Sequence, residues 1–90
     1  MSENKVFMIF QDTEDARPFI GAFEQENPEA HIEYLPGIVR IEAEGRLGVT
    51  QEVVSNLAGR DVDLQELHLT MVSLSGNVDE DEDAFSVAWN

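Results

Sequence analysis

Apolar residues in the first half of the chain follow patterns that predict three strands. The run Val-Phe-Met-Ile-Phe at residues 6–10 predicts a strand that is buried on both faces, or one whose second face is covered by a partner. A short strand is expected over 31–35, followed by the turn dipeptide Pro36-Gly37. Over 38–43 apolar and charged residues alternate, which predicts a strand with one buried face.

The spacing of apolar residues between the first two strands predicts a helix. These residues recur at i, i+3, i+4 and i+7, on one helix face: Ala16, Phe19, Ile20 and Phe23. Proline lacks an N–H, so Pro18 belongs in the first turn, and the helix is expected to begin between residues 13 and 17. Asn27-Pro28 is expected to end it.

The second half of the chain repeats this order of elements. A short extended piece at 46–49 precedes a helix with Thr50 as its N-cap and Gly59 as its C-terminal stop. Residues 67–74 predict a further strand. The last strand carries apolar residues at every second position, which predicts one strongly apolar face: Phe85, Val87 and Trp89.

These elements together predict an α+β fold of two βαββ units packed into one small compact domain, mostly antiparallel sheet with two helices. The whole chain, 1–90, is treated as one domain with a pseudo-repeat of about 5–43 and 46–89. Ninety residues suit a single hydrophobic core.

The charge balance narrows the partners that the chain can have. Five Lys and Arg stand against nineteen Asp and Glu, which gives a formal net charge of −14. Nucleic acids and anionic membranes are bound through Lys and Arg, so neither is an expected partner. The chain has no Cys, no apolar run of about 18 residues and no signal-peptide pattern at residues 1–5, so a soluble cytoplasmic domain is expected.

Side chains that carry chemistry are few. His31 and His68 fall in different predicted elements, and neither has a second ligand at a metal-binding spacing. His68 is expected at the surface of a strand. The serines lack a nucleophile-elbow context, and the glycines do not form a phosphate-binding loop. No catalytic residue, cofactor site or metal site is therefore expected.

The predicted strand at 67–74 has two apolar-leaning faces. One face would hold Thr70, Val72 and Leu74, and the opposite face would hold Leu67, Leu69 and Met71. A strand of this kind is either sandwiched inside the domain or leaves one face for a partner.

The most conspicuous charge run follows this strand: Asp79, Glu80, Asp81, Glu82 and Asp83. It is either a solvated, mobile loop or a patch that steers a basic partner by electrostatic attraction. The glycine and spaced oxygens of a calcium loop are missing.

An ordered set of segments across nearly the whole chain resembles a known family. The segments are Gln65 to Leu69, Val72 to Asp81, Phe85 and Trp89, with 11–17, 26–28 and 36–41 before them. They are similar to the regulatory component of multicomponent phenol hydroxylases, which belongs with the regulatory proteins of soluble methane and toluene diiron monooxygenases.

The resemblance implies a cofactorless, non-catalytic effector protein. Such a protein binds the helical large subunit of a diiron hydroxylase near the metal centre and promotes coupled NADH- and oxygen-dependent hydroxylation of phenols. An NADH-dependent flavin and iron–sulfur reductase supplies the electrons. The resemblance also implies a partner-binding segment made of Thr70, Met71, Val72, Ser73, Leu74, Ser75, Gly76 and Asn77.

Two other functions remain open at this point. The charge of −14 is compatible with an acidic decoy or inhibitor that mimics nucleic acid. An acyl-carrier role fits the size and acidity, but the chain lacks the Asp-Ser-Leu attachment triplet at a helix start.

Overall fold

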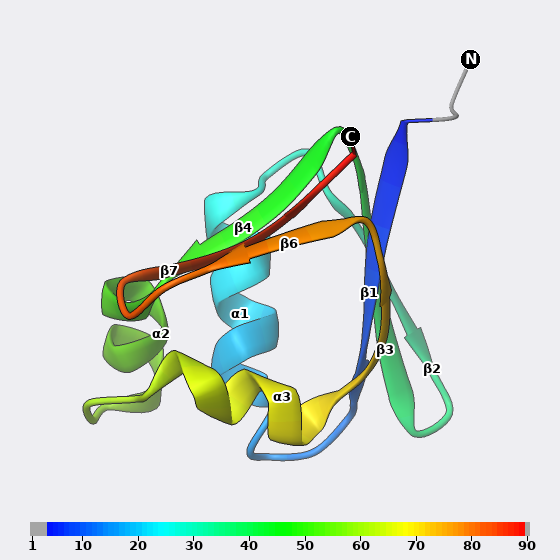
Figure 1. Ribbon diagram of the computed structural model, residues 1–90. Helices are drawn as coiled ribbons and strands as arrows, with labels where there is room; N and C mark the ends of the chain where they lie inside the picture. The colour runs from blue at the N-terminus through cyan, green and yellow to red at the C-terminus, as the bar shows by residue number, and fades with distance from the viewer. Residues whose placement is uncertain (1–3, 90) are drawn as a thin grey trace.

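Seven strands form two antiparallel sheets in the computed structural model, which describes residues 4–89 (Figure 1). The α+β class is confirmed. In chain order the elements are β1 (Lys5–Gln11), α1 (Arg17–Glu26), β2 (His31–Leu35), β3 (Ile38–Glu44), β4 (Arg46–Thr50), α2 (Gln51–Ala58), η1 (Leu64–Glu66), α3 (Leu67–Thr70), β5 (Met71–Ser75), β6 (Asn77–Glu80) and β7 (Ala84–Ala88).

The strand order mixes the two halves of the chain. One sheet has four strands in the order β2-β3-β1-β5, and the other has three in the order β4-β7-β6. All pairs of neighbouring strands are antiparallel. Because β5 comes from the second half and pairs with β1, the halves share a sheet. The pseudo-repeat of 5–43 and 46–89 stays a prediction.

The core lies between the two sheets and α1. Phe10 from β1 and Phe23 from α1 are fully buried, with ring centroids 5.7 Å apart. Phe85 brings the three-stranded sheet into the same core. Burying a side chain of this size stabilises the fold by about 1.5–3 kcal/mol. α1 also contacts α2 and β4, so it connects the elements of both halves (Figure 1).

Strand β1 has one buried face and one half-buried face. Val6, Met8 and Phe10 are fully buried, whereas Phe7 and Ile9 are only half-buried. The expectation that both faces are buried within the domain is therefore wrong, because no element of residues 4–89 fully covers the outer face. A partner on this face stays a prediction.

The predicted bounds of both longer helices agree with the structure, although α1 begins after Ala16 without a side-chain N-cap. Thr50 Oγ1 accepts a hydrogen bond from the Val53 N–H at 3.5 Å, and Gly59 ends α2 in the left-handed region at φ 73°. α1 begins at Arg17 with Pro18 in its first turn, within the predicted interval. The last strand is predicted correctly at Phe85 and Val87.

Trp89 departs from the expected apolar face. It follows the end of β7 and is 48% exposed, while its backbone N–H donates to the Gly45 carbonyl at 2.8 Å. The apolar residues at every second position predict the buried face of β7 but not the residue at which the strand ends.

Side chains from the end of α1 cap the outer edge of β4. The Asn27 amide donates to the Gly48 carbonyl at 2.8 Å and accepts from the Gly48 N–H at 3.2 Å. Glu26 Oε2 accepts from the Thr50 N–H at 2.7 Å. These bonds satisfy backbone groups that an edge strand otherwise leaves open to another chain. They also fix α1 against the three-stranded sheet.

We expect Asn27→Ala to lower the free energy of unfolding by about 1–3 kcal/mol, because it leaves the buried Gly48 N–H and carbonyl without partners. Gln25→Ala, an exposed position on α1, is the matched control and should change stability by less than about 0.5 kcal/mol. Urea unfolding followed by circular dichroism measures both. Equal stability of the two variants would contradict the role of this cap.

Candidate functional site

The segment expected to bind a partner, Thr70 to Asn77, runs from a helix into two strands of different sheets. Thr70 is the last residue of α3, residues 71–75 form β5, and Asn77 begins β6. The predicted strand over 67–74 is therefore wrong in its first half, since Leu67–Thr70 is helical. His68 accordingly lies on a helix and not on a strand.

A capping box before α3 is the reason for this difference. The Asp63 carboxylate accepts from the Gln65 N–H at 3.0 Å, and Glu66 Oε2 accepts from the Asp63 N–H at 3.4 Å. An Asp followed three residues later by Glu, just before apolar residues, is a known signal for a helix start. The sequence contains this signal at Asp63 and Glu66, whereas the alternation of Leu67, Leu69 and Met71 alone favours a strand.

The two faces predicted for this segment do not exist as expected. Thr70 is 6% exposed, and its hydroxyl donates to the Leu67 carbonyl at 3.1 Å. A register shift in the pairing of β5 with β1 leaves Val72 outside the ladder, where it is 54% exposed. Leu74 instead packs against the core, as Met71 does. Thr70, Val72 and Leu74 therefore lie in three different environments.

Gly76 forms the corner between the two sheets. Its φ of 137° lies in a region that L side chains rarely adopt, and a Cβ added there would lie 2.5 Å from Val87 Cγ2. Only glycine fits here without displacing the core. The corner continues β5 into β6, so residues 71–80 form one extended stretch that borders both sheets.

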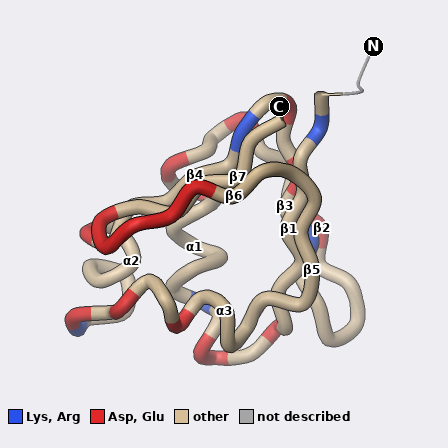
Figure 2. Tube along the Cα trace, viewed as in Figure 1, with Lys and Arg blue, Asp and Glu red and all other residues tan. Residues whose placement is uncertain are grey.

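The acidic run is partly strand and partly turn. Asp79 and Glu80 belong to β6, whereas Asp81 to Asp83 form the connection to β7. Asp81 Oδ1 accepts from the Asp83 and Ala84 N–H groups at 2.8 and 2.9 Å. The run is therefore a structured edge and turn and not a loop throughout. All five residues are exposed, and Figure 2 shows them as a red stretch of the Cα trace.

A hollow of about 610 Å³ lies beside this run. It is lined by carboxylates from two parts of the chain and by amide side chains: Gln51, Val62, Asp63, Gln65, Glu80, Asp81, Glu82 and Asp83. The hollow extends the negative surface from the turn toward η1. Its lining favours cationic groups on anything that approaches.

His68 connects α3 to the edge of the three-stranded sheet. Its Nε2 atom lies 3.0 Å from Glu80 Oε2, and its ring meets the buried Phe85 ring edge-on at 6.0 Å between centroids. His31 lies on β2, away from His68. Within residues 4–89 no group of three or more His, Asp and Glu side chains is placed to hold a metal ion. The same residues contain no helix long and apolar enough to cross a bilayer.

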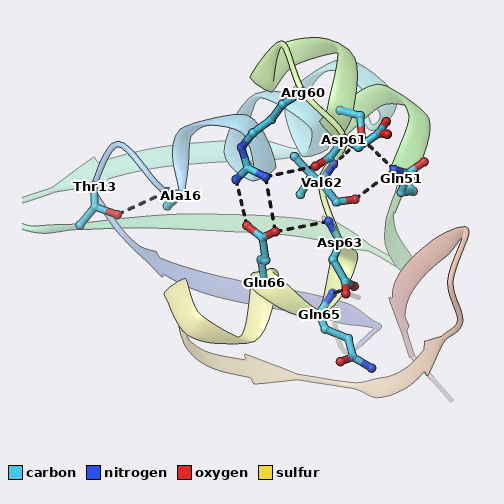
Figure 3. A network of polar contacts seen from close by, with 10 residues as sticks. Thr13, Ala16, Gln51, Arg60, Asp61, Val62, Asp63, Gln65 and Glu66 are labelled. Carbon is cyan, nitrogen blue, oxygen red and sulfur yellow. Dashed lines mark hydrogen bonds and ion pairs between the residues drawn. The ribbon is translucent and has the colours of Figure 1, made fainter.

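Arg60 fixes the chain between α2 and α3 (Figure 3). Its guanidinium donates to Glu66 Oε1 at 2.9 Å and to the Asp61 carbonyl at 3.2 Å. The hydrogen bond from Arg60 lowers the pKa of Glu66, with a smaller effect from the Asp63 N–H, while slight burial acts in the opposite direction. The pKa of Arg60 is raised, first by Glu66 and to a smaller extent by Asp15.

The outer face of the four-stranded sheet is formed in part by β5. Ser73 and Ser75 stand across from Ile9 and Phe7 of β1. The Arg40 guanidinium covers the Phe7 ring at 5.0 Å from the centroid and pairs with Glu42 at 3.2 Å. This face therefore combines half-buried apolar residues, hydroxyls and the Glu42 carboxylate, which pairs with both Lys5 and Arg40, next to the exposed Val72.

Comparison with known proteins shows to which family the chain belongs. The sequence profile of the MmoB/DmpM family matches residues 4–88. The chain belongs to the MmoB/DmpM family. The resemblance seen in the sequence is thereby confirmed.

Individual relatives agree with this membership. Over 84 residues the chain is 42% identical to the stimulatory component DmpM of phenol 2-monooxygenase from Pseudomonas sp. (strain CF600), covering 93% of each protein. A chain in the structure of a phenol hydroxylase–regulatory protein complex superposes with a TM-score of 0.90 at 42% identity, covering 96% of this chain and 99% of that one.

A solved structure of lower sequence identity shares the fold. The soluble methane monooxygenase regulatory protein B superposes with a TM-score of 0.75 at 19% identity. All of this chain is covered, but only 68% of that protein. At this identity the likeness concerns the fold alone.

The Glu66 carboxylate gives the fold a predictable response to acid. Its pKa is lowered in the folded state, so it contributes stability above its unfolded pKa and loses that contribution as the pH falls through the folded pKa. We expect Glu66→Gln to destabilise the protein slightly at neutral pH, because the pair is exposed, and to weaken the loss of stability in acid.

Chemical unfolding over a pH series measures this effect, with Glu24→Gln on the exposed face of α1 as the control. If both variants follow the same pH dependence as the unmodified chain, the Arg60–Glu66 pair contributes nothing to folding.

Proposed function

We propose that this chain is the stimulatory component of a phenol hydroxylase. It binds the diiron hydroxylase component and promotes hydroxylation of phenols coupled to NADH and oxygen. Its 42% identity to a phenol 2-monooxygenase stimulatory component, over 93% of both proteins, is the observation that carries this proposal. The same observation favours this function over an acidic decoy that mimics nucleic acid.

A stimulatory component needs no reactive group of its own. It changes the partner's activity when it binds two conformations of that partner with different affinities. The proposal therefore assigns the chemistry to the hydroxylase, the supply of electrons to a separate NADH-dependent flavin and iron–sulfur reductase, and only binding to this chain. The complex would act in the cytoplasm, where NADH is available.

The segment Thr70 to Asn77 is proposed as the contact with the hydroxylase near its metal centre. Its exposed members, Val72, Ser73 and Asn77, are available to a partner, whereas Thr70 is buried. Met71 and Leu74 pack against the core and support the backbone on which these groups stand. The support for this assignment is position and exposure.

The acidic run is proposed to steer association with a basic surface on the hydroxylase. Five exposed acidic residues lie together at one end of the three-stranded sheet: Asp79, Glu80, Asp81, Glu82 and Asp83. A concentrated charge of this kind raises the rate of encounter with an oppositely charged partner, and salt screens the effect.

Reconstitution tests the function directly. Titrating the chain into diiron hydroxylase and reductase should raise the amount of hydroxylated phenol formed for each NADH consumed. Val72→Arg should weaken binding by more than about 2 kcal/mol, because it places a charge in the middle of the contact. Tyr34→Arg is the control and should activate normally, because Tyr34 is also exposed but lies on the opposite edge of the four-stranded sheet.

The proposed function fails if product per NADH stays constant across the titration. If activation occurs but Val72→Arg behaves like Tyr34→Arg, the contact is misplaced while the function stands. Circular dichroism of both variants confirms that the fold is retained.

Removing charge from the acidic run should slow association. We expect Asp79→Asn, Glu82→Gln and Asp83→Asn together to lower the association rate with the hydroxylase about tenfold at low salt, with little effect at high salt. Asp81 is kept because its carboxylate closes the turn. Stopped-flow measurements compare this variant with one that removes three charges elsewhere, at Glu24, Glu29 and Glu33. Equal rates for the two variants would contradict steering by the acidic run.

A further inference from the structure

One leucine is exposed to an unusual degree beside the proposed contact. Leu69 on α3 is 78% exposed, more than any other large hydrophobic residue in the described part of the chain. Val72, three residues later, is 54% exposed. Together they place two apolar side chains at the junction of α3 and β5, where the core-facing residues on either side are buried.

The backbone that carries Leu69 is held from several directions. Leu64 and Leu67 are buried on the inner side of the same turns. The Thr70 hydroxyl bonds to the Leu67 carbonyl, and the Arg60–Glu66 pair fixes the preceding η1 (Figure 3). A side chain on a fixed backbone loses less conformational freedom on binding than one on a mobile loop. Leu69 therefore has the exposure and the fixed backbone that are typical of an interface anchor.

The surroundings of Leu69 are polar and acidic. It lines a hollow of about 240 Å³ together with Gln11, Thr13, Asp15, Glu66 and Thr70. Arg60 pairs with Glu66 and is also attracted by Asp15, so these three groups leave one net negative charge at this rim. Asp63 and the Glu80 carboxylate beside His68 continue the negative surface away from the hollow.

The negative charge around Leu69 favours one kind of partner for this surface over another. A second copy of the chain also carries −14, so electrostatic repulsion opposes self-association through an acidic surface. A protein surface with cationic groups around an apolar centre complements both features, since apolar anchors bind in desolvated pockets and charges around them are arranged to match.

We propose that Leu69 is an apolar anchor that inserts into a hydrophobic pocket of the hydroxylase whose rim carries Lys or Arg facing Asp15. This inference rests on the proposed function, because it takes the hydroxylase as the partner. It extends the contact beyond Thr70 to Asn77, across α3 and toward the turn that precedes α1. It also assigns the sheet segment and the helical turn to one continuous binding face.

Three variants test the anchor by titration calorimetry with the purified hydroxylase. Leu69→Gln should weaken binding at least about tenfold, because it keeps the length of the side chain and removes its apolar character. Leu69→Met, which stays apolar, should bind within about threefold of the unmodified chain. Tyr34→Gln on β2 is the matched control for an exposed large residue away from this face and should bind normally.

Asp15→Asn tests the charged rim. It should reduce the dependence of the dissociation constant on salt, whereas Glu24→Gln, also on an exposed surface, should not. Thermal unfolding of every variant checks that the fold is unchanged. A salt dependence that Asp15→Asn and Glu24→Gln affect equally would overturn the basic rim.

The outcomes separate this inference from the function on which it rests. If the unmodified chain does not bind the hydroxylase, the proposed function fails. If it binds but Leu69→Gln binds as tightly as Leu69→Met, the anchor is wrong and the function stands. If sedimentation shows that Leu69→Gln disrupts a complex between two copies of the chain while hydroxylase binding is unchanged, a second copy is the occupant and the inference is overturned.

Discussion

The pairing of β5 with β1 is the constraint on which the arrangement depends. It takes a strand from the second half of the chain and makes it the edge of the sheet formed by the first half. Immediately afterwards Gly76 turns the chain into the other sheet, in a backbone conformation and a space that admit no side chain. The segment between α3 and β6 is thus held by both sheets, and its exposed residues stand on a backbone that the core supports.

The surface on either side of this segment has two different characters. Toward α3 the chain exposes Leu69 and Val72, with a short helical turn fixed by a capping box and the Arg60–Glu66 pair. Toward β6 it exposes carboxylates, ordered by the Asp81 turn. Exposed apolar side chains and carboxylates therefore lie next to each other. In protein complexes apolar anchors mainly set the affinity, whereas surface charges mainly set the rate of association.

Particular residues show where sequence reasoning succeeded and where it failed. Thr50 and Gly59 mark the two ends of α2 as expected, because a cap depends only on residues within one turn. Leu67 to Thr70 appeared to alternate like a strand, yet the capping box at Asp63 made them helical. The position of Leu74 also could not be deduced, because a register shift against β1 decides which side of the sheet it faces.

The sequence by itself determined the α+β class, the longer helices, the strands of the first half and the acidic character of the surface. These follow from local patterns, from composition and from a resemblance that spans nearly the whole chain. Only the tertiary structure decided that β5 joins the first sheet, that Thr70 is buried and that Leu69 is exposed. Burial depends on which distant segments meet, and no periodicity within a few residues contains that information.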